Sequence, residues 1–228
     1  MEQINFTIPK EIISLLQNNN ETVLPSPDEV LYWNNYKNRT FYIDYEIEDD
    51  YELLELSKLI IQFNMDEINI PEESLKPIYL FIHSYGGDLE QTNFFCDLVE
   101  SSRIPIYTIA MGASMSAGFL IFLSGKRRFV FNHSQLLVHS GSGVLQGTAE
   151  QIEEAKKNYQ RQIDGMKDFI LKHTTIDART FNKNRRKDWY LTTDEIVKYN
   201  VGEVINSFTD FYKPDTVIVK EEKEQSDL

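Results

Sequence analysis

Residues 104–124 read Ile-Pro-Ile-Tyr-Thr-Ile-Ala-Met-Gly-Ala-Ser-Met-Ser-Ala-Gly-Phe-Leu-Ile-Phe-Leu-Ser. Two apolar stretches flank a run of small residues that is typical of a turn. The first stretch, 104–110, predicts a buried strand, and residues 114–124 predict a helix. A strand that leads through a short turn into a helix is the repeating unit of α/β folds, so this stretch sets the fold class.

The same unit recurs on both sides of this stretch. Upstream we expect helix 28–36, strand 40–43, helix 51–63, strand 77–82 and helix 89–101. Downstream we expect strands 128–132 and 135–138, helices at about 148–173 and 193–199, and strand 203–205. The series predicts one α/β domain over residues 28–210. Residues 1–27 then form an N-terminal extension, and residues 211–228 form a charged tail that we expect to be flexible.

Composition excludes several classes of function. The chain of 228 residues carries a formal net charge of −13, and a field of this sign repels phosphate backbones, so we expect no nucleic acid partner. The most apolar run, 117–123, is far shorter than the roughly 20 residues of a membrane span, so we expect no membrane insertion. The single cysteine, Cys96, favours the cytoplasm and a buried, small apolar role. Four scattered histidines without zinc-type spacing predict no metal and no other cofactor.

The helix predicted at about 148–173 differs from the others, because few large apolar residues occupy its first half. Its start is marked by Thr148 and, three residues later, Gln151, which is the spacing of a capping box. So polar a helix has no complete apolar stripe with which to join a core. We therefore expect it to project from the domain or to pack against a partner chain.

Three turns that follow predicted strands carry residues suited to chemistry. Gly86-Gly87 leaves backbone N–H groups bare, as an oxyanion site needs. Ser114 opens a helix, where small neighbours and the positive helix end favour a reactive hydroxyl. His139 ends an apolar strand and suits a general base. Each also has a purely structural interpretation: an ordinary turn, a helix N-cap and a strand-end histidine.

The order of the motifs makes the pattern specific. Residues 112–118 (Gly-Ala-Ser-Met-Ser-Ala-Gly), 125–127 (Gly-Lys-Arg) and 132–139 (Asn-His-Ser-Gln-Leu-Leu-Val-His) follow one another closely. In this order they resemble the proteolytic subunit of ATP-dependent Clp proteases, and Asp-Trp-Tyr-Leu-Thr at 188–192 adds to the resemblance, which spans about residues 28–208. It implies a ClpP/crotonase-like α/β fold of repeated strand–turn–helix units with a protruding handle helix.

Carried over by position, the resemblance implies a role for five residues. Ser114 falls on the nucleophile, His139 on the general base and Asp188 on the carboxylate that orients the histidine. The backbone N–H groups of Gly87 and Met115 fall on the oxyanion hole. A Ser–His–Asp triad of this kind attacks a carbonyl carbon, and the oxyanion hole stabilises the tetrahedral intermediate.

Some features depart from the family pattern or leave a choice open. Asp177 and Asp194 are alternative carboxylates for the third triad position, because only the fold context selects Asp188. Tyr85 stands where the family usually has proline before the two glycines, and Ser140-Gly141 stands where it commonly has Gln-Pro. Losing proline removes a rigid brace, so the shape of the cleft and its preference are expected to differ.

The resemblance implies a serine endopeptidase that cleaves unfolded polypeptides inside a chamber of two stacked heptameric rings, which meet through the handle helices. Folded substrates would then need a ring ATPase that unfolds them, and residues 1–27 fall where the family has axial gating loops. No Gly-x4-Gly-Lys-Ser/Thr phosphate-binding loop occurs in the sequence, so ATP use would belong to another chain. The alternatives are a non-proteolytic ring subunit, a viral capsid-maturation peptidase and a crotonase-type acyl-CoA enzyme.

Overall fold

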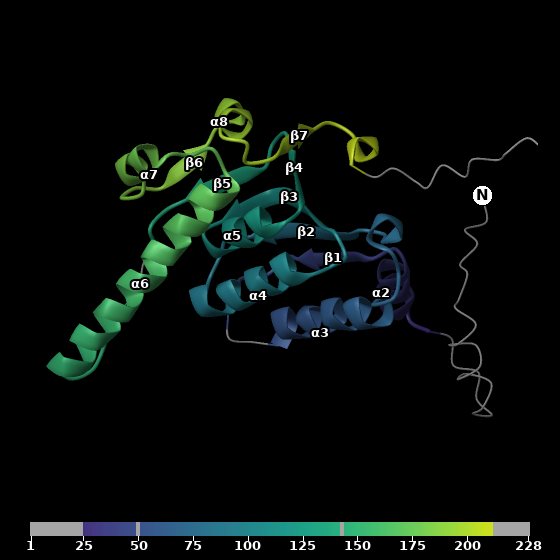
Figure 1. Cartoon of the computed structure of the whole chain (residues 1–228), viewed down its shortest axis with the longest axis horizontal. Coiled ribbons are helices and arrows are strands. Elements are labelled where there is room, and N and C mark those ends of the chain that lie inside the picture. The colour runs from purple at the N-terminus through teal and green to yellow at the C-terminus, as the bar shows by residue number, and fades with distance from the viewer. Residues whose placement is uncertain (1–24, 49–50, 142–143, 212–228) are drawn as a thin grey trace, which may run out of the picture.

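The computed structural model describes residues 25–48, 51–141 and 144–211. Within them seven strands form one sheet, in which β1, β2, β3, β4 and β7 are neighbours in that order and β5 pairs with β3 and β6 (Figure 1). All pairs are parallel except β5 with β6. The strands are β1 (Thr40–Ile43), β2 (Ile78–Ser84), β3 (Ile106–Met115), β4 (Arg127–Phe131), β5 (Gln135–Val138), β6 (Trp189–Leu191) and β7 (Glu203–Ile205).

Helices alternate with these strands, as the sequence pattern predicts for most of the chain. The expected ones are α2 (Pro27–Lys37), α3 (Tyr51–Asp66), α4 (Leu89–Ser101), α5 (Ala117–Ser124), α6 (Ala149–His173) and α8 (Thr193–Lys198). Three elements were not predicted: α7 (Ala178–Asn184) and the short 3₁₀ helices η1 (Glu72–Ser74) and η2 (Phe208–Asp210). Helix α7 has one buried side chain, Phe181, so it lacks the apolar periodicity that reveals longer helices.

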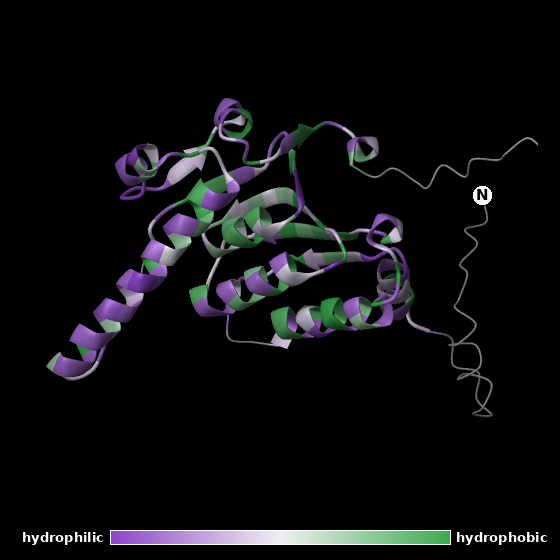
Figure 2. Cartoon of the chain, in the orientation of Figure 1, coloured by the Kyte–Doolittle hydropathy of each residue, from purple (hydrophilic) through white to green (hydrophobic). Residues whose placement is uncertain are grey.

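The main core lies between the sheet and helices α3, α4 and α5. Ile78, Leu80 and Ile82 of β2 point to this core, which the apolar sides of the three helices complete. Helix α5 is buried along its whole length, and Figure 2 shows its mostly apolar colouring. Because both faces of β2 are covered, its sequence is a continuous apolar run rather than an alternating one.

The opposite face of the sheet carries a second, aromatic cluster. Phe211, just after η2, is 4% exposed and closes this cluster. Its ring centroid lies 5.5 to 6.5 Å from those of four rings on the sheet, Tyr79, Phe81, Phe129 and Phe131. The last described residue, Phe211, is therefore part of a core, although we expected a flexible tail from residue 211 onward. Residues 212–228 lie outside the described part of the chain.

Strand β3 is longer than predicted, and this changes the site. The expected strand ended at Ala110, but β3 continues to Met115 because it changes partners along its length. Residues 107–110 pair with β4 and residues 113–115 pair with β5. The small residues up to Met115, which we expected in a turn and the start of a helix, therefore belong to the sheet. Helix α5 begins at Ala117 rather than at residue 114.

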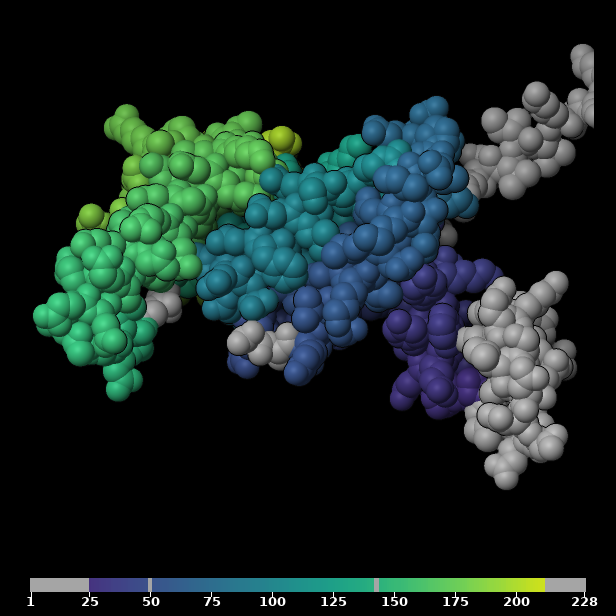
Figure 3. All heavy atoms as spheres, turned by 60° about the horizontal axis from the view of Figure 1, so that its bottom comes forward, coloured from purple at the N-terminus to yellow at the C-terminus, as the bar shows by residue number. Residues whose placement is uncertain are grey.

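Helix α6 projects from the domain (Figures 1 and 3). Its capping box is present, since the Thr148 hydroxyl accepts from Gln151 N–H and the Gln151 side chain accepts from Thr148 N–H. The buried residues of α6, Ile163, Met166 and Ile170, all lie in its C-terminal half. The N-terminal half is polar and exposed, as predicted for a helix that leaves the core (Figure 2).

Two further findings concern the whole described chain. None of the helices found there combines the length and the apolar character that crossing a bilayer demands. Most of the N-terminal extension expected over residues 1–27 lies outside the described residues, which begin at residue 25.

Candidate active site

Ser114, expected at the centre of the site, lies inside the sheet instead. It belongs to β3, paired with Ser84 on one side and Leu136 on the other, and it is fully buried. Its hydroxyl donates to the carbonyl oxygen of Ile82 at 3.3 Å. The structure therefore contradicts the expected pairing of Ser114 with His139.

The serine that meets the histidine is Ser116. Its Oγ lies 2.6 Å from Nε2 of His139. Ser116 joins β3 to α5 with φ 53° and ψ −118°, a strained conformation for a residue with a side chain. A sharp strand-to-helix turn of this kind exposes a serine hydroxyl at the edge of a sheet. Ser116 is half-buried, in contrast to Ser114.

The signal that would have identified Ser116 is the glycine two residues later. A Cβ on Gly118 would lie 3.1 Å from the carbonyl oxygen of Ser84, a tight contact, so the close packing of α5 on β2 favours glycine there. Ser116 has this glycine two residues after it, the spacing typical of a nucleophilic serine in a strand-to-helix turn, and Ser114 does not.

His139 reaches Ser116 because of strand pairing. It follows β5 directly, and β5 pairs with the end of β3 through Met115 and Leu137. The N–H of Ser116 donates to the carbonyl oxygen of Leu137 at 3.1 Å. Both residues therefore leave the sheet at the same edge, as expected for the ends of parallel strands. The expected position of His139 at a strand end is confirmed.

Asp188 is set opposite His139 by the antiparallel pair β5–β6. Val138 pairs with Trp189, so the next pair outward is His139 and Asp188. Asp188 Oδ1 lies 3.7 Å from His139 Nδ1, which is close enough for an ion pair and too long for a hydrogen bond. The Asp188 side chain is 63% exposed, which leaves it room to move.

The two alternative carboxylates have different surroundings. Asp177 is the N-cap of α7 and accepts a hydrogen bond from Thr180 N–H at 2.7 Å. This bond lowers the pKa of Asp177, which is committed to its helix. Asp194 lies in the first turn of α8 and is exposed. Of the three carboxylates, Asp188 is the one paired with His139.

The double-glycine turn lies directly against the Ser116 turn. Ile47 holds it by two hydrogen bonds, accepting from Asp88 N–H at 2.6 Å and donating to Gly86 O at 2.8 Å. A Cβ on Gly86 would lie 2.7 Å from the Ser116 Cβ, and one on Gly87 would lie 1.8 Å from the Ile47 oxygen. Both residues have positive φ angles, so glycine is required at each.

Two backbone N–H groups beside Ser116 find no hydrogen-bond acceptor within the described residues. They belong to Gly87 and to Ala117, the first residue of α5. Met115, the predicted second donor, precedes Ser116 and lies within β3. The predicted serine, Ser114, lies two residues before Ser116, and the predicted donor, Met115, therefore lies two residues before Ala117. Ala117 is the residue that directly follows the serine beside His139.

A cavity of about 630 Å³ opens beside these groups. Ser116, His139 and Asp188 all line it, as do Gly87 and Ala117. Its other walls come from β3, β5 and one side of α6. The groups that the chemistry needs therefore share one space large enough for several peptide residues.

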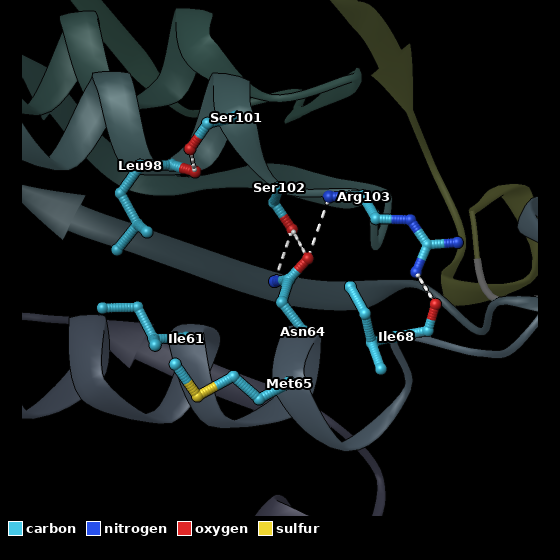
Figure 4. Close-up of a pocket in the computed structure, with 8 residues that line it drawn as sticks. All are labelled: Ile61, Asn64, Met65, Ile68, Leu98, Ser101, Ser102 and Arg103. Atoms are coloured by element: carbon cyan, nitrogen blue, oxygen red, sulfur yellow. Dashed lines mark hydrogen bonds between the residues drawn. The ribbon is translucent and has the colours of Figure 1, made fainter.

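A second hollow of about 430 Å³ lies between the ends of α3 and α4 (Figure 4). Its walls are Ile61, Met65, Ile68 and Leu98, and its polar groups serve the fold. The Asn64 side chain donates to Ser102 Oγ and accepts from the backbone N–H of Arg103, both at 2.9 Å. Because its polar side chains are engaged in hydrogen bonds within the fold, the hollow offers no free nucleophile and no base.

Metal and thiol chemistry find no site in the described part of the chain. No group of three or more His, Cys, Asp or Glu side chains is arranged there to hold a metal ion. Cys96 is buried in α4 as predicted, and burial raises the pKa of its thiol. A thiol protonated to this degree is a poor nucleophile.

Comparison with known proteins identifies the family. The sequence profile of the Clp protease family matches residues 34–207, and the chain belongs to this family. ATP-dependent Clp protease proteolytic subunit 2 of Treponema denticola is 32% identical over 128 residues, covering 55% of this chain and 64% of that protein. The protein of the same name from Treponema pallidum is 27% identical with the same coverage. The alignments thus span slightly less than two thirds of these relatives.

The fold also matches that of a solved structure. A mutant of ClpP1 from Listeria monocytogenes matches with a TM-score of 0.67 at 22% identity, covering 78% of this chain and 98% of that chain. This likeness confirms the mixed α/β fold with its parallel sheet.

Proposed function

We propose that the chain is a serine endopeptidase of the Clp type, with Ser116 as nucleophile, His139 as general base and Asp188 as the carboxylate that orients the base. The observation that supports it most is the distance of 2.6 Å between Ser116 Oγ and His139 Nε2, in the wall of a cavity large enough for several peptide residues. Ser116 replaces Ser114 in this proposal.

The proposed reaction has two halves. His139 Nε2 takes the proton of Ser116 as its Oγ attacks the peptide carbonyl carbon. The N–H groups of Gly87 and Ala117 stabilise the oxyanion, and His139 then gives the proton to the leaving amine. Water, activated in turn by His139, hydrolyses the acyl-enzyme and frees Ser116.

Asp188 completes the triad by a small movement. Its Oδ1 must come from 3.7 Å to hydrogen-bonding distance of His139 Nδ1, and its exposed side chain can rotate to do so. Catalytic hydrogen bonds are often long before substrate binds and shorten in the complex. Once engaged, the carboxylate holds the imidazole tautomer that presents a bare Nε2 to Ser116.

The assembly belongs to the same proposal. The exposed polar half of α6 suits an interface between two rings, because its charges would find partners there. We place the active sites inside a closed chamber of two stacked heptameric rings, with unfolded polypeptides as substrates. An AAA+ ATPase that unfolds proteins would supply them, and the cytoplasm is the expected compartment.

Two serine variants test the catalytic proposal. Ser116→Ala is expected to abolish hydrolysis of a fluorogenic peptide, and Ser114→Ala to keep it within a few-fold of the wild type. Labelling with a fluorophosphonate should follow the same order, which separates a peptidase from a non-proteolytic ring subunit. Equal hydrolysis by the wild type and Ser116→Ala would overturn the proposal. Loss of labelling only in Ser114→Ala would restore the original assignment.

The assembly has its own test. Native mass spectrometry of the full chain should give a complex of fourteen copies of the 26.7 kDa subunit. Reversing charges in the exposed half of α6, for example with Lys156→Glu and Lys157→Glu together, should separate the rings and leave seven-subunit particles. A monomer at micromolar concentration would argue against a chamber.

A further inference from the structure

The wall that α6 contributes to the active-site cavity carries a polar side chain, Gln162, beside apolar ones. Ile163 and Met166 of α6 and Leu120 and Leu137 opposite them give the cavity apolar sides. Gln162 lies among them and also lines the cavity. Its amide is half-buried and makes no side-chain hydrogen bond to any other described residue.

We infer that Gln162 selects the substrate side chain on the acyl side of the scissile bond, and that it favours glutamine there. The inference rests on the proposed function and adds a substrate preference to it. The acyl residue stays bonded to Ser116 Oγ through both halves of the reaction, so the cavity beside this oxygen receives its side chain.

An uncharged side chain with a polar tip satisfies this space best. Apolar walls favour the methylene groups of a long, unbranched side chain. When such a side chain fills the cavity, it displaces water from the Gln162 amide. An apolar tip then leaves the amide without a partner, whereas a glutamine amide can both donate to it and accept from it.

The charge of the cavity disfavours glutamate, the acidic analogue of glutamine, at the acyl-side position. The carboxylates of Asp88 and Asp188 line the same cavity, and among its described lining residues there is no lysine or arginine. A glutamate in the same place would meet these two carboxylates without a cation. Tyr159 narrows the space from α6, and its hydroxyl donates to Ser140 O at 3.5 Å.

Three fluorogenic peptides that differ only in the acyl-side residue test the inference: methionine, glutamine and glutamate have nearly the same length and differ at the tip. For the wild type, kcat/KM for glutamine should exceed that for methionine by about tenfold, the worth of one hydrogen bond to a partly buried amide. Glutamate should be the poorest of the three.

The decisive variant is Gln162→Met, which keeps the length of the side chain and removes the amide. The ratio of kcat/KM for glutamine over methionine should fall about tenfold, to near one. The matched control is Gln160→Met, because Gln160 is exposed on the same helix and pairs with Asp164. Its ratio should equal that of the wild type.

The outcomes distinguish this inference from the proposed function. A wild-type ratio of one or less, or a ratio that Gln162→Met leaves unchanged, overturns the glutamine preference while peptidase activity stands. No hydrolysis of any peptide beyond that of Ser116→Ala overturns the proposed function and the preference with it.

Discussion

Gly86→Ala tests whether the contact between the two turns sets catalytic geometry. The new methyl carbon would lie 2.7 Å from the Ser116 Cβ, 2.9 Å from the Met115 carbonyl oxygen and 3.1 Å from the Ala117 nitrogen. Two of these three neighbours are backbone atoms, which cannot rotate away. The methyl group would therefore push the Ser116 turn and the double-glycine turn apart.

The size of the effect follows from these distances. Ordinary van der Waals contact begins at 3.4 Å, so the Ser116 Cβ must retreat by about 0.7 Å. A misplacement of about 1 Å costs on the order of 100-fold in rate, so we expect kcat/KM to fall by roughly 10- to 100-fold. The positive φ of Gly86, 112°, adds strain of about 1–3 kcal/mol, which lowers the free energy of unfolding.

The assay is peptide hydrolysis combined with urea unfolding, and the control is Gly165→Ala. Gly165 lies in α6, and a Cβ there has no atom within 4 Å. The same chemical change should leave kcat/KM unaltered and raise the free energy of unfolding by about 0.5–1 kcal/mol, because alanine favours a helix.

A displaced Ser116 turn and a general loss of stability have different consequences for activity. Gly86→Ala must lose activity under conditions where urea unfolding shows that it is fully folded. If the folded variant hydrolyses peptide at the wild-type rate, the contact between the turns does not control the oxyanion geometry, and the assignment of Gly87 as a donor loses its support.

Three further changes have expected outcomes. Asp188→Asn should lower kcat by about 10²- to 10⁴-fold while peptide binding persists, and a wild-type kcat would remove Asp188 from the triad. Phe211→Ala should lower the free energy of unfolding in urea by about 3–5 kcal/mol because it opens a cavity among four rings, whereas Phe208→Ala, 62% exposed, should cost far less. Burial lowers the pKa of His173 below its ordinary 6.5, although its Nε2 lies 2.6 Å from Glu100 Oε1. Below about pH 6.5 the unfolded chain therefore binds a proton that the folded chain resists, so stability should fall from pH 7 to pH 5, and less steeply in His173→Gln; equal slopes in urea titrations would contradict this.

Most strands and helices could be predicted from the sequence. Strands such as β2 and β7 and helices such as α4 lie within a few residues of their predicted bounds, because apolar periodicity and capping residues are local features. The projection of the N-terminal half of α6 also follows from composition, since this half lacks the apolar residues with which it could join a core. The burial of Phe211 could not be predicted in this way, because the rings around it come from two strands, β2 and β4, that lie far from it in the sequence.

The nucleophile was misplaced for a reason of the same kind. Residues 112–116 contain two serines among small residues, and no local pattern shows where β3 ends. Its end is decided by a change of partner from β4 to β5, which lies more than 20 residues further along the chain. Strand pairing is a tertiary property, so helix and turn propensities placed the turn two residues early.

The pairings of β5 explain why Ser116, His139 and Asp188 meet although they lie far apart in the sequence. The parallel pair β3–β5 sets Ser116 beside His139, and the antiparallel pair β5–β6 sets Asp188 beside His139. Strand β5 is only four residues long, yet it belongs to both pairs. A slip of one residue in its register would turn His139 to the other face and separate it from both partners at once. The buried Leu136 and Val138 oppose that slip, because it would remove them from the main core. The apolar residues of β5 therefore protect the geometry of the site as well as the core.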